Sequence, residues 1–280
     1  MDLVTKNMMI RKIKRTWGLA KMALSHLWLP KENVNISQVE INGINLLLFS
    51  NEDVGRELVY GRSYEWRETL VLKRLLRPDD ICIDVGANIG YYSTLMAKIA
   101  YRGDVHAFEP VPINWHILNI NLILNKLSNA VTNLIALGSE SGKKNFSVSK
   151  DGAYSSILPT GREMEDETIE IKVETIDEYV NTRQLKRVDV IKVDAEGAEG
   201  LILSGAYQLF REQTKRPRLV MLELFDANLL PYGTNIDEII LKMKGWGYSV
   251  KIAGNNGDLL PFSMSMKNRI CNIFFELNYK

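Results

Sequence analysis

Two carboxylates near the ends of strand-like runs are the first candidates for chemistry. Asp84 lies near the end of the apolar run ICIDV, and Glu109 ends the run DVHAFE. In an open α/β sheet the carboxyl ends of parallel strands meet at one edge, where ligands bind, and an acid after the second strand can accept hydrogen bonds from ribose hydroxyls. The pair therefore favours a nucleoside ligand.

A glycine-bearing loop, DVGANIG, joins Asp84 to the helical pattern YYSTLMAKIA. Gly86 and Gly90 allow a sharp turn and a close approach to a ligand, and free N–H groups at a helix start attract an anionic group such as a carboxylate. By itself the loop also fits a tight connection that binds nothing. The missing GxGxxG and the acid before the loop disfavour a pyrophosphate-bearing dinucleotide. An aminoacyl nucleoside with a sulfonium and an ammonium suits Asp84 better.

A second dense cluster, VDVIKVDAEGAEG, covers residues 188–200. Strand alternation places Lys192 and Asp194 on one face of a segment that we expect to be buried. Buried charges persist only when they are paired or used. From the spacing alone, a structural ion pair of Lys192 with Asp194 or Asp84 is the favoured interpretation.

Carboxylates at this rim are also suited to act on a hydroxyl group. Asp194 and Glu196 follow the strand end, and Glu223 ends the next strand, so each is a candidate to orient or deprotonate a hydroxyl. Together they could instead bind Mg²⁺ or Ca²⁺ through oxygen ligands, which we do not favour, and no metal site is predicted. His106, inside the second strand, and His116, on the helix after it, are expected to pack or lie at the surface.

The elements that must position these residues alternate between strand and helix from residue 63 onward, which predicts a parallel sheet covered on both faces. A helix is expected over residues 64–76, closed by Pro78. Strands are expected at residues 81–85, 104–109, 131–137, 188–194 and 218–224. Two terminal strands, in GYSVKIAG and RICNIFFEL, are separated by the turn GNNGD and are expected to close the sheet edge as an antiparallel hairpin.

Residues 1–62 are predicted to form an extension before a main domain of residues 63–280. Apolar residues recur there with helical spacing, at Ile10, Ile13, Trp17, Ala20, Leu24 and Leu27. The cationic face of this amphipathic helix, residues 8–28, could contact an anionic membrane, although packing on protein is slightly favoured. The runs VNISQVEI and INLLLFS flank Asn42-Gly43, which predicts a β-hairpin with a type I′ turn.

Composition excludes several classes of protein. The 280 residues are 46% hydrophobic and 25% charged, as in an ordinary globular chain, and Lys+Arg 35 against Asp+Glu 34 is too balanced for a general nucleic-acid surface. Cys82 and Cys271 form no zinc or disulfide cluster, which favours a reducing, cytoplasmic compartment. No run approaches the roughly 18 apolar residues of a membrane span, and a signal peptide is a poor interpretation of the amino-terminal residues.

Taken together, these residues resemble the FkbM-type methyltransferases, a branch of the class I S-adenosylmethionine-dependent enzymes. The resemblance runs from about Tyr64 to the end, through YEWRETLVLKRLLRPDD, DVGANIGYYS, FEP, IALGSESG, AYSS, VETIDEY, IKVDAEGAE and MLEL, with Ala195 where the family often has Val or Ile. It implies an α/β fold with a Rossmann-like seven-stranded sheet whose last strand is antiparallel. It also implies that S-adenosylmethionine is bound by Tyr64, Glu65, Asp84, Gly86, Ala87, Asn88, Gly90, Glu109, Pro110, Ala136 and Asp194.

The resemblance further implies methylation of a hydroxyl oxygen on a sugar, glycolipid or polyketide-like natural product. The acceptor is then a small molecule, a glycan or a glycolipid, and the catalytic candidates are Lys192, Asp194, Glu196 and Glu223. A nicotinamide-dependent oxidoreductase is one alternative, against which the missing GxGxxG counts. A non-catalytic, membrane-attached scaffold is the other, and the intact glycine and acidic positions count against it. A homo-oligomer is left open, and nucleic acid is not expected as a partner.

Overall fold

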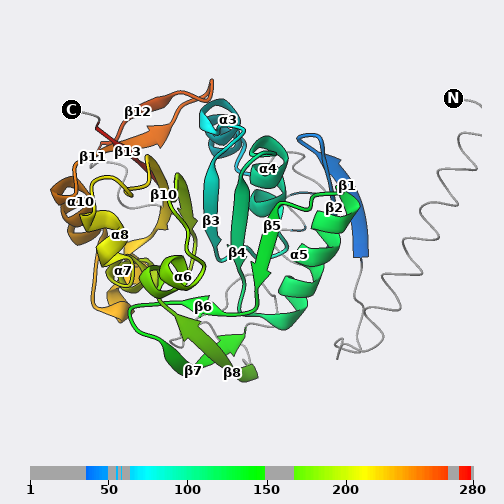
Figure 1. The fold of residues 1–280 in the computed structure, drawn as a ribbon, viewed down its shortest axis with the longest axis horizontal. Coiled ribbons are helices and arrows are strands. Elements are labelled where there is room, and N and C mark those ends of the chain that lie inside the picture. The colour runs from blue at the N-terminus through cyan, green and yellow to red at the C-terminus, as the bar shows by residue number, and fades with distance from the viewer. Residues whose placement is uncertain are drawn as a thin grey trace, which may run out of the picture.

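The computed structural model describes residues 36–49, 55, 58, 64–148, 167–263 and 271–278. At its centre lies an eight-stranded sheet in the order β12-β11-β13-β10-β9-β3-β4-β5 (Figure 1). In chain order these strands are β3 (Ile81–Val85), β4 (Asp104–Phe108), β5 (Ala130–Asn133), β9 (Val190–Val193), β10 (Leu219–Leu224), β11 (Tyr248–Ala253), β12 (Leu259–Pro261) and β13 (Cys271–Leu277). Strands β10, β9, β3, β4 and β5 are parallel to one another, and β13 runs antiparallel to β10. The predicted α/β fold with a reversed last strand is confirmed.

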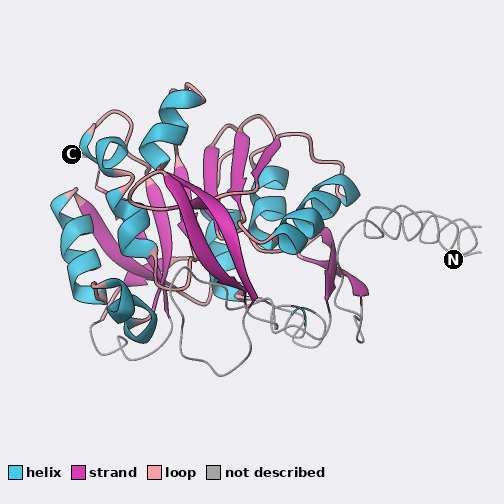
Figure 2. Cartoon of the chain, turned by 90° about the horizontal axis from the view of Figure 1, so that it is seen from below, coloured by secondary structure: helices cyan, strands magenta, loops and turns pink. Residues whose placement is uncertain are grey.

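Helices pack on both faces of this sheet (Figure 2). One apolar core joins one face of the strands to α3 (Trp66–Leu75), α4 (Tyr91–Ile99) and α5 (Pro112–Leu124). The other core joins the opposite face to α6 (Ile176–Thr182), α7 (Glu199–Ser204), α8 (Tyr207–Arg211), α9 (Asp226–Leu229) and α10 (Ile236–Gly245), with a short 3₁₀ helix at Leu230–Tyr232. Cys82 contributes to the first core and its neighbour Ile83 to the second. Because both faces of the sheet are buried, the sequences of these strands are continuous apolar runs.

Two smaller sheets flank the main one. Strands β6 (Ala136–Leu137), β8 (Glu167–Glu174) and β7 (Gly142–Val148) form a three-stranded sheet, drawn below the main sheet in Figure 1. Strands β1 (Ile36–Ile41) and β2 (Ile44–Phe49) form the predicted hairpin. Asn42 and Gly43 at its turn have φ values of 54° and 78°, which a type I′ turn requires.

Three expectations about the elements need correction. The run 131–137 is not one strand, because the chain bends after β5 and sends β6 into the small sheet. The turn GNNGD joins β11 to the short edge strand β12, whereas β13 comes later and lies between β11 and β10. The added edge strand raises the count from seven to eight. The helix expected over residues 64–76 is α3, which starts at Trp66 and ends at Leu75.

Parts of the sequence-based interpretation lie outside the described residues. These are the amphipathic helix over residues 8–28 and the AYSS segment at residues 153–156. The boundary between an extension and a main domain at residues 62 and 63 stays a prediction. Within the described part of the chain, no helix has the length and apolar character needed to cross a bilayer.

Candidate active site

The glycine loop between β3 and α4 touches the end of β9. The N–H groups of Gly86 and Ala87 both donate to the Phe108 carbonyl oxygen, at 3.0 Å each, which ties the loop to the end of β4. Gly86 has a φ of 70°, and a Cβ built there would lie 1.8 Å from the Asp194 carbonyl oxygen. Only glycine fits this position, and its contact brings the loop against the rim formed by β9.

Glu109 is fixed by two backbone donors at the end of β4. The Asn88 N–H donates to its Oε2 at 2.8 Å, and the Val111 N–H donates to its Oε1 at 2.9 Å. Burial raises the pKa of Glu109 to about 7. Each carboxylate oxygen can accept a further hydrogen bond, so Glu109 keeps the capacity expected of a ribose ligand. Pro110 follows directly and is half-buried.

Ala136 lies on a different element from the other predicted cofactor residues. It is buried in β6, in an apolar cluster that also contains Val111. Because the N–H of Val111 is one of the two donors to Glu109, this cluster stands beside the carboxylate. Ala136 therefore shares an apolar cluster with a residue that binds Glu109, and its own contact with the cofactor stays a prediction.

Lys192 forms the centre of an ion-pair network beneath the loop. Parallel pairing places it beside Asp84 in adjacent strands, and its Nζ lies 3.6 Å from Asp84 Oδ1 and 3.3 Å from Asp194 Oδ2. The same Nζ donates to the Gly86 carbonyl oxygen at 3.0 Å. Ser93 donates to the other oxygen of Asp84 at 2.5 Å. The geometry is that of the structural ion pair favoured from the sequence.

The charge on Lys192 is held by this network. Burial opposes the charged ammonium, but the nearby carboxylates of Asp194 and Asp84 outweigh it and raise the pKa of Lys192 above its usual range. Its Nζ also lies 5.5 Å from the centre of the Tyr92 ring, within reach of a cation–π interaction. Lys192 is therefore a permanent cation that orients its partners, and it has no free base form to offer at neutral pH.

Glu65 reaches the site from the residue before α3. Its carboxylate accepts hydrogen bonds from the Tyr92 hydroxyl and, at 2.8 Å, from the Asn272 side-chain amide. Burial raises the pKa of Glu65 to about 7, despite the hydrogen bond from Tyr92. Tyr64, beside it, packs edge-on against Tyr91 with the ring centres 5.3 Å apart. Both predicted residues of this segment thus lie against the start of α4.

Three carboxylates gather where β9 and β10 end. Each of Asp194, Glu196 and Glu223 has an oxygen within 4.8 Å of those of the other two. Glu196 has a left-handed φ of 51°, and its Oε2 accepts a hydrogen bond from the Asn228 amide at 2.9 Å. Burial, and then repulsion by Asp194 and Glu196, raise the pKa of Glu223 to about 10. Glu223 is therefore protonated at neutral pH, which makes it a hydrogen-bond donor.

Glu223→Gln is expected to become progressively more stable than the parent protein as the pH rises from about 5 to about 9. In the folded parent, Glu223 stays protonated up to its pKa of about 10, whereas in the unfolded chain it ionises above a pKa of 4.5. Between these two pKa values, each rise in pH therefore lowers the free energy of unfolding of the parent. Glutamine at this position does not titrate. Thermal denaturation of both ligand-free proteins across this range measures the difference in Tm, and a difference that stays constant contradicts the raised pKa.

Sequence reasoning missed several residues that complete the site. Tyr92 and Ser93 lie in the first turn of α4, just after the glycine loop, so their place at the helix start was a usable signal. No sequence motif identifies Asn228 or Asn272 as a site residue. They reach the site only because α9 and β13 pack beside it. Glu199 also follows β9 in the sequence, but its role was not predicted: the residue is buried, and its Oε1 accepts the Ala195 N–H at 2.9 Å and shapes the turn after β9.

The two histidines lie where they were expected. His106 is buried in β4, its Nδ1 lies 2.9 Å from the Tyr179 hydroxyl, and burial lowers its pKa. His116 is half-buried on α5, where its ring packs edge-on against Trp115. Neither is placed with the carboxylates of the rim.

The chain matches the methyltransferase FkbM domain over residues 84–250. It is 27% identical over 206 residues to 31-O-demethyl-FK506 methyltransferase FkbM of Streptomyces tacrolimicus, covering 62% of this chain and 75% of that protein. It is 30% identical over 175 residues to methyltransferase sdnD of Sordaria araneosa, covering 52% and 66%. It is 31% identical over 128 residues to hexuronic acid methyltransferase AglP of Haloferax volcanii, covering 45% and 50%.

The matched domain of residues 84–250 contains the glycine loop, Glu109, the Lys192 network and Glu223. The matched segments span between half and three quarters of the length of these relatives. The domain itself covers more than half of this chain. The chain belongs to the FkbM methyltransferase family of class I, S-adenosylmethionine-dependent methyltransferases.

Proposed function

We propose that this protein transfers a methyl group from S-adenosylmethionine to a hydroxyl oxygen of a sugar, glycolipid or natural-product acceptor. The observation that carries the proposal is the contact of Gly86 with Asp194, which sets the carboxylate rim directly against the glycine loop. Among the relatives, one is named a 31-O-demethyl-FK506 methyltransferase and one a hexuronic acid methyltransferase. Both names are consistent with a hydroxyl-rich acceptor.

The residues present fit S-adenosylmethionine. Asp84 Oδ1 is buried and accepts no hydrogen bond from the described residues, and Glu109 keeps acceptor capacity on both oxygens. Among the described residues, the carboxylates of Asp84, Asp194 and Glu196 outnumber the ammonium of Lys192 that pairs with them, so the site favours a cationic ligand. Asp84, Glu109 and the loop would hold the cofactor, which supplies an electrophilic methyl group on a sulfonium when bound.

In methyl transfer, the residues of this chain align the reacting groups and remove the proton of the acceptor hydroxyl. Holding two reacting groups in line supplies as much as about 7 to 11 kcal/mol of the barrier reduction, and a placed base adds roughly 10² to 10⁴ in rate. Lys192 holds the Asp194 carboxylate at the rim, so Asp194 is the strongest candidate to orient the acceptor hydroxyl and take its proton. Protonated Glu223 is suited to donate a hydrogen bond there, with Glu196 as the alternative base.

Metal-independent catalysis stays a prediction. Asp194, Glu196 and Glu223 have the oxygen ligands that Mg²⁺ prefers, but Lys192 already supplies a cation 3.3 Å from Asp194 Oδ2. Peripheral membrane contact through residues 8–28, a homo-oligomer, the absence of a nucleic-acid partner and a cytoplasmic location also stay predictions.

Cofactor choice and product chemistry test the proposal directly. Isothermal titration is expected to show binding of S-adenosylmethionine and none of NAD, because the loop lacks a pyrophosphate site. Incubation with methyl-labelled S-adenosylmethionine and sugar, glycolipid and polyketide-like acceptors is expected to yield a labelled methyl ether. Binding of NAD alone would support an oxidoreductase. A protein that binds neither ligand would point to a non-catalytic scaffold, and label on nitrogen or carbon would overturn O-methylation.

A further inference from the structure

Two asparagines, Asn121 in α5 and Asn125 directly after its end, cover the free edge of the N-terminal hairpin. Asn125 accepts the Asn45 N–H at 2.8 Å and donates to the Asn45 carbonyl oxygen at 2.6 Å. Asn121 repeats this with Leu47, accepting its N–H at 2.6 Å and donating to its carbonyl oxygen at 3.0 Å. The spacing agrees, because four helical residues rise about 6.0 Å and two strand residues about 6.8 Å. The side-chain amides thus act as the partner that no described strand provides to β2 on this side.

Asn121 makes one bond that Asn125 does not. Its amide also donates to the Ile89 carbonyl oxygen at 2.7 Å. Ile89 lies inside the glycine loop, between Asn88, with a left-handed φ of 50°, and Gly90, with a φ of 87°. Asn121 is fully buried, and this bond commits the second hydrogen of its amide. A single buried side chain therefore connects the hairpin to the loop.

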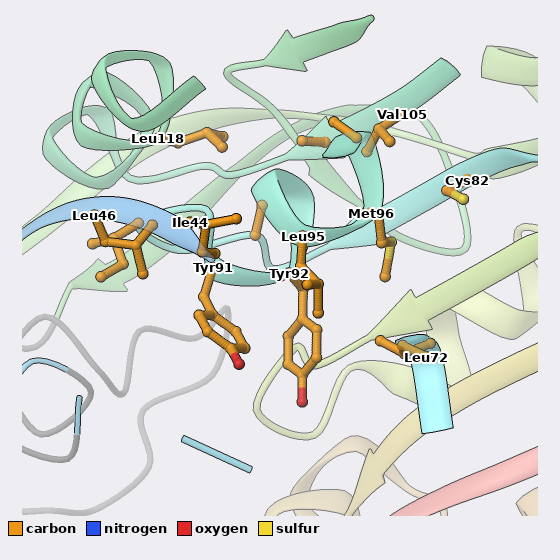
Figure 3. Close-up of a cluster of buried hydrophobic side chains, with 14 of the residues drawn as sticks. Ile44, Leu46, Leu72, Cys82, Tyr91, Tyr92, Leu95, Met96, Val105 and Leu118 are labelled. Atoms are coloured by element: carbon orange, nitrogen blue, oxygen red, sulfur yellow. The ribbon is translucent and has the colours of Figure 1, made fainter. Parts of the chain in front are cut away.

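A second link joins the hairpin turn to the start of α4. The Asn42 amide donates to the Tyr91 hydroxyl at 2.8 Å, and that hydroxyl also lies 2.8 Å from Thr69 Oγ1. Figure 3 shows Ile44 and Leu46 of β2 near Tyr91, and all three belong to one apolar core. The hairpin therefore contacts both the loop and the first residue of the helix that follows it.

We propose that Asn121 is a positioning residue for the cofactor loop and that the hairpin of residues 36–49 braces this loop through Asn121 and through the bond from Asn42 to Tyr91. The hairpin lies outside the matched domain of residues 84–250, so this role is additional to the family's shared part. Supporting contacts of this kind hold a binding loop in its productive geometry. Without the Asn121 amide, the Ile89 carbonyl loses its partner and the loop's left-handed residues lose a restraint. The inference rests on the proposed function, because it places the cofactor at this loop.

Asn121→Ala and Asn125→Ala form a matched pair that tests the brace. Both remove two bonds to the hairpin, and only the first removes the bond to the loop. We expect Asn121→Ala to weaken S-adenosylmethionine binding about tenfold, and Asn125→Ala to change it less than about twofold. In the ligand-free proteins, hydrogen exchange of the amides at residues 86–92 should accelerate in the first variant only.

Asn42→Gly provides a second test if Asn121→Ala does not fold. Glycine keeps the positive φ of the turn and removes only the side-chain bonds, including the one to Tyr91. Faster exchange of residues 86–92 in Asn42→Gly than in Asn125→Ala supports the brace. Equal exchange and equal affinity in the compared variants overturn it. If the parent chain binds no S-adenosylmethionine, the proposed function fails, whereas the exchange measurement still decides whether the hairpin restrains the loop.

Discussion

Asp194→Asn is expected to lower the turnover number by roughly 10² to 10⁴, while the affinity for S-adenosylmethionine changes far less. Asparagine keeps the size of the side chain and removes its charge, so the acceptor hydroxyl loses its base. The pair with Lys192, at 3.3 Å, is weakened at the same time. Turnover and the dissociation constant must therefore be measured separately, with single-turnover methylation and calorimetry on the same preparation.

Asp189→Asn serves as the control for charge removal in the same strand region. Asp189 lies at the amino end of β9, where its Oδ2 accepts the Ile81 N–H at 2.8 Å and lies 3.1 Å from Arg187 Nε. The change is expected to lower the Tm and to leave turnover at the parent rate. Glu196→Gln and Glu223→Gln should reduce turnover by a similar or smaller factor than Asp194→Asn. Parent rates in all three rim variants would leave alignment alone to account for catalysis.

Glu109→Ala is expected to weaken S-adenosylmethionine binding by about 100-fold or more, because two hydrogen bonds to a charged group are lost at once. The change also leaves the N–H groups of Asn88 and Val111 without their acceptor, which loosens the loop. Titration calorimetry measures the affinity. Glu170→Ala, at an exposed carboxylate in β8, is the matched control and should bind as the parent does. Unchanged affinity in a folded Glu109→Ala protein would exclude this placement of the cofactor.

The positions of Asp84, Glu109 and Lys192 could be predicted because local pattern determines them. Apolar runs identify the parallel strands, and parallel strands bring their carboxyl ends to one edge. Strand alternation likewise places Lys192 and Asp194 on one face, and their atoms lie 3.3 Å apart. The positions of these residues follow from the alternation of side chains along a strand and from the order of strands and helices in the sequence.

The partners of these residues could not be predicted, because they depend on packing between distant segments. Asn272 reaches Glu65 from β13, across most of the chain, and Asn228 reaches Glu196 from α9. The protonated state of Glu223 depends on how closely three carboxylates approach, which strand periodicity does not specify. The edge strand β12 was missed because three residues are too few for a periodic pattern.

The position of β13 has a consequence for how the chain folds as it is synthesised. Strand β13 follows β11 and β12 in the sequence but lies between β11 and β10 in the sheet. A nascent chain that has emerged only as far as residue 261 therefore leaves two facing strand edges open, and open edges attract other chains. The same intermediate lacks Asn272, so Glu65 has only part of its hydrogen bonding. Completion of the sheet and completion of this corner of the active site therefore both wait for the same strand, β13.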